Sequence, residues 1–385
     1  MDTQIPEQYI QPFDRDAALE VFRHRAGLYR TRRALADGKL TLGFIGGSVT
    51  DANGQSWPDP VIVWFQQRFP GVRLTVENAA IGATRSDLAV FRAERDLIDR
   101  GCDLVFVEYV VNDNWEPVEK RKRSREGLLR KLLAGEGRDV VLVYTFCQGM
   151  YWEISRGMVP ASIAEFEELG EHYRLGSVWM GLHALREVQA GIMRWEEWLP
   201  DGAHAQARGS LSYARSVTTF LDRELIVDPT PEAIPTGDRR PAPLNPEHWE
   251  FARKLPFDVV SFEGPWTIRR CTTSPWFDQV IDTSAVGARL SIPFEGRGLV
   301  LGLEYREFAA EFLWRLDGGE WRRANRVNGP GWSSCYISVL ADDLPAGRHT
   351  LELEVVHGNQ PDSEGAFHPE FKGTTLRLLL IGVIP

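Results

Sequence analysis

Short apolar runs alternate with amphipathic segments from residue 17 to about residue 224. Runs suited to buried strands occupy residues 40–45, 72–76, 104–111 and 140–146. The spacing of apolar residues predicts helices ahead of and between these runs, at residues 17–37, 61–69, 87–100 and 118–133. Apolar strands that alternate with helices pair in parallel through right-handed crossovers. The pattern therefore predicts a three-layer α/β/α sandwich around a parallel sheet.

The pattern changes after the helical stretch that ends near Glu224. Residues 228–246 carry six prolines and little that a core would hold, so they are interpreted as a linker. Beyond them, strands are predicted at residues 288–293, 298–305, 311–316, 335–339, 350–356 and 375–383, and the Asp317-Gly318-Gly319 turn is typical of a hairpin. We therefore expect a helical extension (1–37), an α/β domain (38–228), a proline-rich linker (229–246) and an all-β sandwich (247–385).

Composition narrows the classes of function. With 44 basic against 54 acidic residues, the net charge of -10 argues against a nucleic-acid or anionic-membrane surface and favours a small neutral or cationic substrate. The polar start of the chain and the lack of a long apolar stretch lead us to expect a cytoplasmic protein. The four cysteines form no CxxC pair, so no zinc site is indicated. The basic run at residues 120–123 is interpreted as a solvated helix face.

Three residues that can carry chemistry are predicted at the carboxyl ends of neighbouring strands. Ser48 follows the first strand in a Gly46-Gly47-Ser48 turn, Gly82 lies past the second strand and Asn112 ends the third. Parallel strands bring their carboxyl ends to one rim, where open α/β folds bind ligands. An oxyanion formed at Ser48 would there meet the amides of Ser48 and Gly82 and the side chain of Asn112. A Gly-Gly-Ser turn by itself is equally typical of a phosphate cradle or of a plain strand end.

A candidate base, His204, lies far along the chain. Asp201 precedes it by three residues, on a predicted loop before a helix that begins near Gln206. An ionised aspartate at this spacing can hold the tautomer of the imidazole, whose other nitrogen then takes the proton of Ser48. Alone, the segment would also suit a surface turn or a helix cap. The conjunction of all four blocks favours catalysis over those readings.

In their order and at these strand ends, the four blocks resemble those of the SGNH or GDSL hydrolase family, whose name residues would be Ser48, Gly82, Asn112 and His204. The resemblance covers about residues 38–225. It implies a five-stranded parallel sheet of flavodoxin-like order and ester hydrolysis through an acyl-serine, without a metal or other cofactor. The chain departs from the family at Gly47, usually aspartate, which we expect to open the pocket, and at Val110, usually glycine, which we expect to narrow it.

Further residues near the predicted rim have two readings each. Trp57 and Trp115 lie a few residues past Ser48 and Asn112. Each tryptophan would serve either as a stacking floor for a sugar or as ordinary packing. Arg85 and Glu108 are interpreted as a buried ion pair and are given no part in the chemistry.

The C-terminal region resembles the galactose-binding-like jelly-roll modules attached to sugar esterases, on residues 294–298, 316–321 and 344–351. Such a domain would bind sugar, shape the cleft or make an oligomer contact. The sequence as a whole predicts a deacylase of small carbohydrate esters, with acetyl as the expected acyl group. Two alternatives stay open: a short-chain carboxylesterase or lysophospholipase-like enzyme, and a non-catalytic carbohydrate-binding protein.

Overall fold

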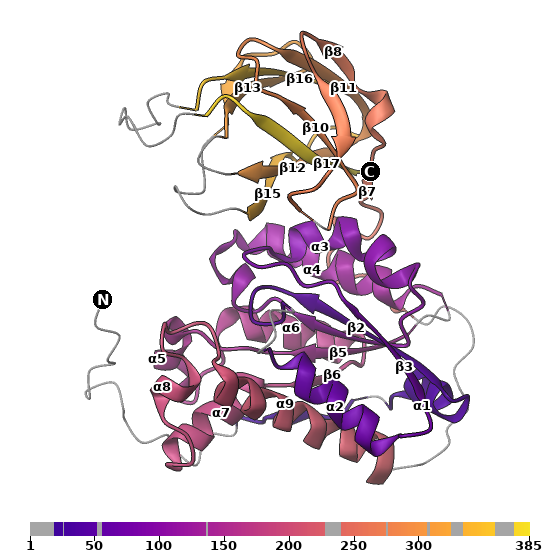
Figure 1. The fold of residues 1–385 in the computed structure, drawn as a ribbon, viewed down its shortest axis with the longest axis vertical. Coiled ribbons are helices and arrows are strands. Elements are labelled where there is room, and N and C mark those ends of the chain that lie inside the picture. Colours follow the sequence, from indigo (N-terminus) through magenta and orange to yellow (C-terminus); the bar gives the residue numbers. More distant parts are fainter. Residues whose placement is uncertain are drawn as a thin grey trace. The chain divides into compact units, whose positions relative to one another are not determined.

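A computed structural model describes residues 19–25, 27–51, 56–135, 138–227, 240–274, 276–305, 309–324, 334–358 and 373–385 (Figure 1). Internal contacts divide the chain into two units, Met1–Glu250 and Phe251–Pro385. The predicted extension at residues 1–18 and the predicted linker at residues 228–239 lie outside the described residues. Among the helices that are described, none combines the length and the apolar character needed to cross a membrane.

A six-stranded sheet in the order β1-β6-β5-β4-β2-β3 forms the centre of the first unit. Strands β2 to β6 are parallel, and their order, β3-β2-β4-β5-β6, is the flavodoxin-like one. Their near-continuous apolar runs suit strands covered on both faces. The predicted fold class is thus confirmed for this unit. The strands are β1 (Phe22–Arg23), β2 (Lys39–Gly46), β3 (Arg73–Asn78), β4 (Leu104–Glu108), β5 (Asp139–Val143) and β6 (Gly176–Val178).

Helices cover both faces of this sheet (Figure 1). Helices α2 (Pro58–Arg68) and α9 (Ala207–Asp222) pack together on one face, and α3 (Ser86–Ala93), α4 (Val118–Leu133) and α6 (Ala161–His172) pack on the other. Helix α3 continues into a π-helical segment, η2. The remaining helical elements of the unit are α1 (Tyr29–Ala36), η2 (Glu94–Ile98), η3 (Asn112–Trp115), η4 (Gln148–Met150), α5 (Tyr151–Ile154), α7 (Met180–Gln189), α8 (Trp195–Trp198) and η5 (Arg223–Val227).

The helix predicted at residues 17–37 is wrong in its first part. Phe22 and Arg23 form β1, which pairs antiparallel with β6, and helix α1 begins only at Tyr29. The backbone N–H of Trp179 extends this pairing by donating to the carbonyl of Val21 at 2.7 Å. The open edge of β6 offers backbone partners that a helix could not use, and these tertiary contacts override the local helical spacing.

Helix α4 has the predicted bounds, but its basic run is not a solvated face. The ammonium group of Lys120 lies 2.6 Å from the carboxylates of both Asp87 and Glu116. Arg121 is buried and donates two hydrogen bonds to Glu165, at 2.7 and 2.6 Å. Because buried cations need paired carboxylates, this face of α4 is part of the interior of the unit.

Residues 240–250 pack onto α4. The carboxylate of Glu126 accepts the backbone N–H groups of Leu244 and Asn245 at 2.6 and 2.7 Å. Trp249 is fully buried, and a Cβ added at Gly127 would lie 2.5 to 2.7 Å from its backbone. Residues 240–246, predicted as linker, therefore belong to the first unit, which ends at Glu250 rather than at residue 228.

The second unit is a β-sandwich of two antiparallel sheets. One sheet has the order β15-β12-β17-β10-β9, with β7 beside β17, and the other has the order β14-β13-β16-β11-β8. Strands β10 to β17 thus follow the jelly-roll arrangement, which confirms the predicted fold of this region. The strands are β7 (Arg253–Lys254), β8 (Ser261–Glu263), β9 (Thr267–Arg270), β10 (Gln279–Thr283), β11 (Arg289–Gly296), β12 (Gly298–Tyr305), β13 (Glu311–Leu316), β14 (Arg322–Arg323), β15 (Ser334–Ala341), β16 (Gly347–Val356) and β17 (Leu376–Ile384), and a short 3-10 turn, η6, spans Phe257–Val259.

The predicted hairpin turn joins β13 to β14. Asp317 and Gly318 both have positive φ, 52° and 69°, and the N–H of Gly319 donates to the carbonyl of Leu316. Positive φ at both central residues is the turn geometry that matches the twist of antiparallel strands. Asp-Gly was therefore a reliable signal of this hairpin.

Candidate active site

The turn after β2 fixes the backbone of Ser48. The carbonyl of Gly47 accepts the N–H groups of Thr50 and Asp51, both at 3.1 Å. In a trans peptide the C=O and N–H groups point in opposite directions, so the N–H of Ser48 faces away from these two donors. A Cβ at Gly47 would lie 2.3 Å from Oδ1 of Asn112. We expected Gly47 to open the pocket. Instead, the space that a side chain would take at Gly47 is filled by the Asn112 amide.

His204 lies directly against the serine. Its Nε2 is 2.8 Å from Oγ of Ser48, and its Nδ1 is 2.6 Å from Oδ2 of Asp201. The other oxygen of Asp201 accepts the N–H groups of Ala203 and His204 at 2.9 and 2.7 Å. With the Nδ1 proton donated to Asp201, Nε2 of His204 is free to accept the proton of Ser48. The structure thus brings together the three residues that the sequence predicts as nucleophile, base and orienting acid.

The Asp201 carboxylate is stabilised in its ionised form. Burial alone would raise the pKa of Asp201, but the hydrogen bonds from the His204 and Ala203 N–H groups and the His204 ring outweigh it and lower the pKa below its ordinary value. Asp201 and His204 are nonetheless about half exposed, at 54% and 51% of their side-chain surface. The pair is therefore open to water, unlike the base of a deeply enclosed site.

Amide donors surround the serine. A Cβ placed on Gly82 would be 3.7 Å from Cβ of Ser48, so the two residues are neighbours. The Asn112 side chain lies against Gly47 on the other side. Within the described part of the chain, no hydrogen bond engages the N–H of Ser48, the N–H of Gly82 or the side-chain amide of Asn112. Three unengaged donors near one hydroxyl are the arrangement that holds a tetrahedral oxyanion.

Buried charges hold Asn112 in place. The carboxylate of its neighbour Asp113 accepts the backbone N–H of Ser86 at 3.0 Å and Nε of Arg125 at 2.7 Å. Nε of Arg85 donates to the carbonyl of Asn112 at 3.3 Å and pairs with Glu116 at 2.9 Å. The predicted ion pair of Arg85 with Glu108 is therefore wrong. The sequence placed both residues near the rim. It could not show that Arg85 pairs with Glu116, just before α4, while Glu108 is hydrogen-bonded to the turn after β2.

The two tryptophans near the site differ completely. Trp57 is fully buried against Phe44 and Phe106, and its Nε1 donates to Oγ1 of Thr50 at 3.1 Å. The prediction of a sugar-stacking floor at Trp57 is wrong, because this side chain packs into the core where α2 begins. Trp115 is 75% exposed, and its ring lies 3.9 Å from where a Cβ on Gly149 would be.

Trp115 lies beside a segment that contacts the loop of the base. Gly149 belongs to η4, whose first residue, Gln148, donates its N–H to the carbonyl of Gly202 at 2.7 Å. Gly202 has φ +81°, and a Cβ there would lie 2.7 Å from Oε1 of Gln148.

Val110 stands where the SGNH pattern usually has glycine, and we expected it to narrow the pocket. Its side chain is fully buried, so it does not narrow a cleft.

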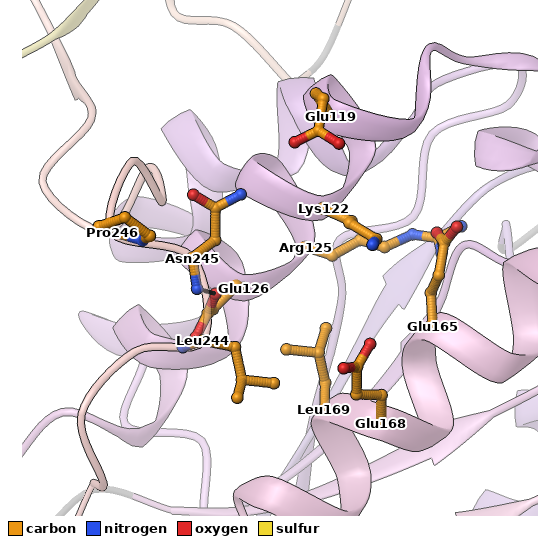
Figure 2. A pocket seen from close by; sticks show the side chains of 10 residues that line it. All are labelled: Glu119, Lys122, Arg125, Glu126, Glu165, Glu168, Leu169, Leu244, Asn245 and Pro246. Atoms are coloured by element: carbon orange, nitrogen blue, oxygen red, sulfur yellow. Dashed lines mark hydrogen bonds and ion pairs between the residues drawn. The ribbon is translucent and has the colours of Figure 1, made fainter.

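A pocket of about 330 Å³ opens elsewhere in this unit, between α4, α6 and residues 244–246 (Figure 2). None of the candidate site residues lines it. Glu126 and Glu165 on its wall are already engaged, Glu126 by the Leu244 and Asn245 amides and Glu165 by Arg121. In the part of the chain that is described, no group of three or more His, Cys, Asp or Glu side chains is placed to hold a metal ion.

Comparison with known proteins supports the two-domain architecture. No protein-family model matches the sequence, and no curated protein is detectably similar to it. Among solved structures, a two-domain esterase (CEX) active on acetylated mannans, co-crystallized with mannopentaose, has 22% identity and a TM-score of 0.77 over 94% of this chain and 95% of its own. A second structure of such an esterase gives 22% identity and a TM-score of 0.76, over 94% and 98% of the two chains. At this identity the likeness establishes a shared fold.

A weaker likeness covers half of the chain. The acetylxylan esterase Axe2 from Geobacillus stearothermophilus has 19% identity and a TM-score of 0.37 over 49% of this chain and 95% of its own. Overlap at this level is not evidence of a common activity. The shared fold of the two-domain proteins and the geometry around Ser48 are therefore the observations from which function is inferred.

Proposed function

We propose that this protein is a serine esterase that removes small acyl groups, above all acetyl, from carbohydrate esters. One observation carries the proposal: the continuous hydrogen-bonded series from Ser48 Oγ through His204 to Asp201, beside three unengaged amide donors. A non-catalytic binding protein has no need of an imidazole within 2.8 Å of a serine hydroxyl with its tautomer held by a carboxylate.

The geometry supports acyl transfer in two steps. His204 Nε2 accepts the proton of Ser48 as the hydroxyl attacks the ester carbonyl, and the amides of Ser48, Gly82 and Asn112 bind the resulting oxyanion. As the tetrahedral intermediate collapses, His204 returns the proton to the departing alcohol. Water then gives a proton to His204 as it attacks the acyl-serine, and His204 returns that proton to Oγ of Ser48 as the second tetrahedral intermediate releases the acid. Asp201 stays ionised throughout and keeps the ring aligned.

The preference for a carbohydrate alcohol has two supports. The exposed ring of Trp115 lies beside Gly149 of η4, whose neighbour Gln148 is hydrogen-bonded to the loop of His204, and we place the departing alcohol against this ring. An aromatic face with no apolar cover suits the CH face of a sugar ring. The two-domain proteins that share this fold are esterases active on acetylated mannans.

The test of the activity is covalent labelling. A fluorophosphonate probe is expected to label the wild-type protein at Ser48, and the Ser48→Ala variant is expected to be unlabelled and inactive on p-nitrophenyl acetate. A folded wild-type protein that binds oligosaccharide but neither reacts with the probe nor releases p-nitrophenol would show a binding protein and end the proposal.

The test of the alcohol preference uses Trp115. For acetylated manno- or xylo-oligosaccharides, Trp115→Ala is expected to raise KM about tenfold, which corresponds to ~1.4 kcal/mol of stacking. Trp115→Phe keeps an aromatic face and should lose less. For p-nitrophenyl acetate, KM should be the same in all three proteins. Equal KM values for the oligosaccharides, or faster turnover of longer acyl esters of simple alcohols, would favour a general short-chain carboxylesterase.

A further inference from the structure

A carboxyl group that the proposed reaction does not use lies beneath the nucleophile. Glu108 is the last residue of β4, is fully buried, and is paired in register with Gly46 of β2. Its Oε2 accepts the N–H of Gly47 at 3.3 Å and the hydroxyl of Thr50 at 3.0 Å. Both donors belong to the turn that carries Ser48, one on each side of it.

The direction of these hydrogen bonds is fixed by a third group. Nε1 of Trp57 lies 3.1 Å from Oγ1 of Thr50 and can only donate, so Glu108 is the acceptor that the described contacts offer to the Thr50 hydroxyl proton. Oε2 of Glu108 is therefore an acceptor of two hydrogen bonds. Its other oxygen, Oε1, has a single neighbour, the hydroxyl of Thr145, at 2.7 Å. A hydroxyl can act either as donor or as acceptor in that contact.

Nothing nearby compensates a charge on this carboxyl. Among the described residues, no lysine, arginine or histidine side chain is paired with Glu108, and the carboxylate of Asp113 acts on it with a charge of the same sign. Glu108 also acts electrostatically on Tyr109 and Tyr213, but burial raises the pKa of both phenols and keeps them neutral. A full negative charge here would lack a counter-ion and would also oppose the oxyanion that forms one residue away from Gly47.

We propose that Glu108 is a positioning residue that holds the Ser48 turn as a neutral carboxylic acid, with Oε2 accepting the Gly47 and Thr50 protons and Oε1 donating its own proton to Thr145. Every polar atom of the group is then satisfied. Burial, reinforced by the charge of Asp113, raises the pKa of Glu108, in agreement with this state. This inference rests on the proposed esterase function, because it concerns the placement of its nucleophile.

Three variants test the role. Glu108→Gln presents a carbonyl oxygen to Gly47 and Thr50 and an NH₂ donor to Thr145, so it reproduces the neutral acid. It is expected to keep kcat for p-nitrophenyl acetate within about threefold of wild type and to give a superimposable pH profile. Glu108→Leu removes all three hydrogen bonds and is expected to lower kcat at least about tenfold at unchanged KM, as for a displaced nucleophile. Thr50→Val removes one hydrogen bond and should fall between them, at about threefold.

Four outcomes would overturn the proposal. If Glu108→Gln loses as much kcat as Glu108→Leu, or if its pH profile differs from that of wild type, the group works as a charged carboxylate. If Glu108→Leu folds, judged by its Tm, and keeps the wild-type kcat, the residue positions nothing. If Glu108→Leu does not fold, wild-type kcat in Thr50→Val decides against the proposal. Fluorophosphonate labelling of wild type separates these failures from failure of the esterase proposal, which would leave wild type itself unlabelled.

Discussion

The nucleophile and its base are held in different ways. Ser48 sits on a turn that is hydrogen-bonded to Glu108, far away in sequence. The side chain of Asn112, from another strand end, packs against Gly47 of the same turn. The N–H and ring of His204 are held by Asp201, three residues away on the same loop, and its side chain is half exposed. The position of the serine is thus a property of the sheet, whereas the position of the imidazole is a property of a short exposed loop.

This difference separates stability from activity. Substitutions under the Ser48 turn disturb buried polar groups, which are costly to leave unsatisfied, and should therefore affect both folding and turnover. Substitutions in the Asp201 to His204 loop remove exposed groups and should affect turnover alone. Three variants, taken from the largest expected loss of activity to the smallest, test whether the two regions can be separated in this way.

His204→Ala is expected to reduce turnover of p-nitrophenyl acetate by about four orders of magnitude or more, because no other group can take the Ser48 proton. Its Tm should equal that of wild type, since the side chain is half exposed and packs little. Steady-state kinetics and a thermal melt measure both quantities. A large residual rate would mean that a different residue acts as the base.

Asp201→Asn is expected to lower kcat by about a thousandfold, because an amide that donates to Nδ1 favours the wrong tautomer of His204. In wild type the lowered pKa of Asp201 keeps the carboxylate ionised to lower pH than usual. Protonation of Asp201 should therefore begin to cost activity only below the ordinary aspartate range, and the stability that the ionised carboxylate contributes should be lost as the pH falls through this lowered pKa. An NMR titration in which the Asp201 carboxyl titrates at or above the ordinary aspartate pKa would contradict this.

Asn112→Ala is expected to lower kcat by about a hundredfold with little change in KM, as for the loss of one oxyanion donor. In contrast to the loop variants, it also leaves a void beside Gly47, where the amide packs. A small fall in Tm should accompany the loss of rate. If Asn112→Ala retained wild-type kcat, the oxyanion would be bound by the two backbone amides alone.

The sequence predicted the elements whose signals are local. The bounds of α4 follow from periodicity, and the β13 to β14 turn follows from Asp317 and Gly318, which adopt positive φ at low cost. The Ser48, Gly82, Asn112 and His204 blocks could be placed at one rim because parallel strands fix where their ends meet. Strands β2 to β5 could be predicted because each contains a short apolar run, which is a local signal.

The errors concern partners that are distant in sequence. Phe22 and Arg23 lie in a stretch with helical spacing, but they pair with the edge of β6 instead. Trp57 and Trp115 are the same residue type and each follows a candidate site residue, and only the packing of α2 shows that one is core and the other is surface. Glu108 and Arg85 were paired because both lie near the rim, whereas each has a different partner across the fold.

Strand β1 also covers the outer edge of β6. The outer side of β6 would otherwise present unsatisfied backbone groups, on which a strand of another chain could add. Among the described residues, Phe22 and Arg23 cover it in register, and the side chain of Arg25 donates to the carbonyl of Leu175 at 2.9 Å. A variant that begins after Gly27 would keep every residue around Ser48 and yet expose the unpaired backbone groups along the edge of β6. Such a variant would be expected to aggregate while its folded molecules keep their catalytic activity.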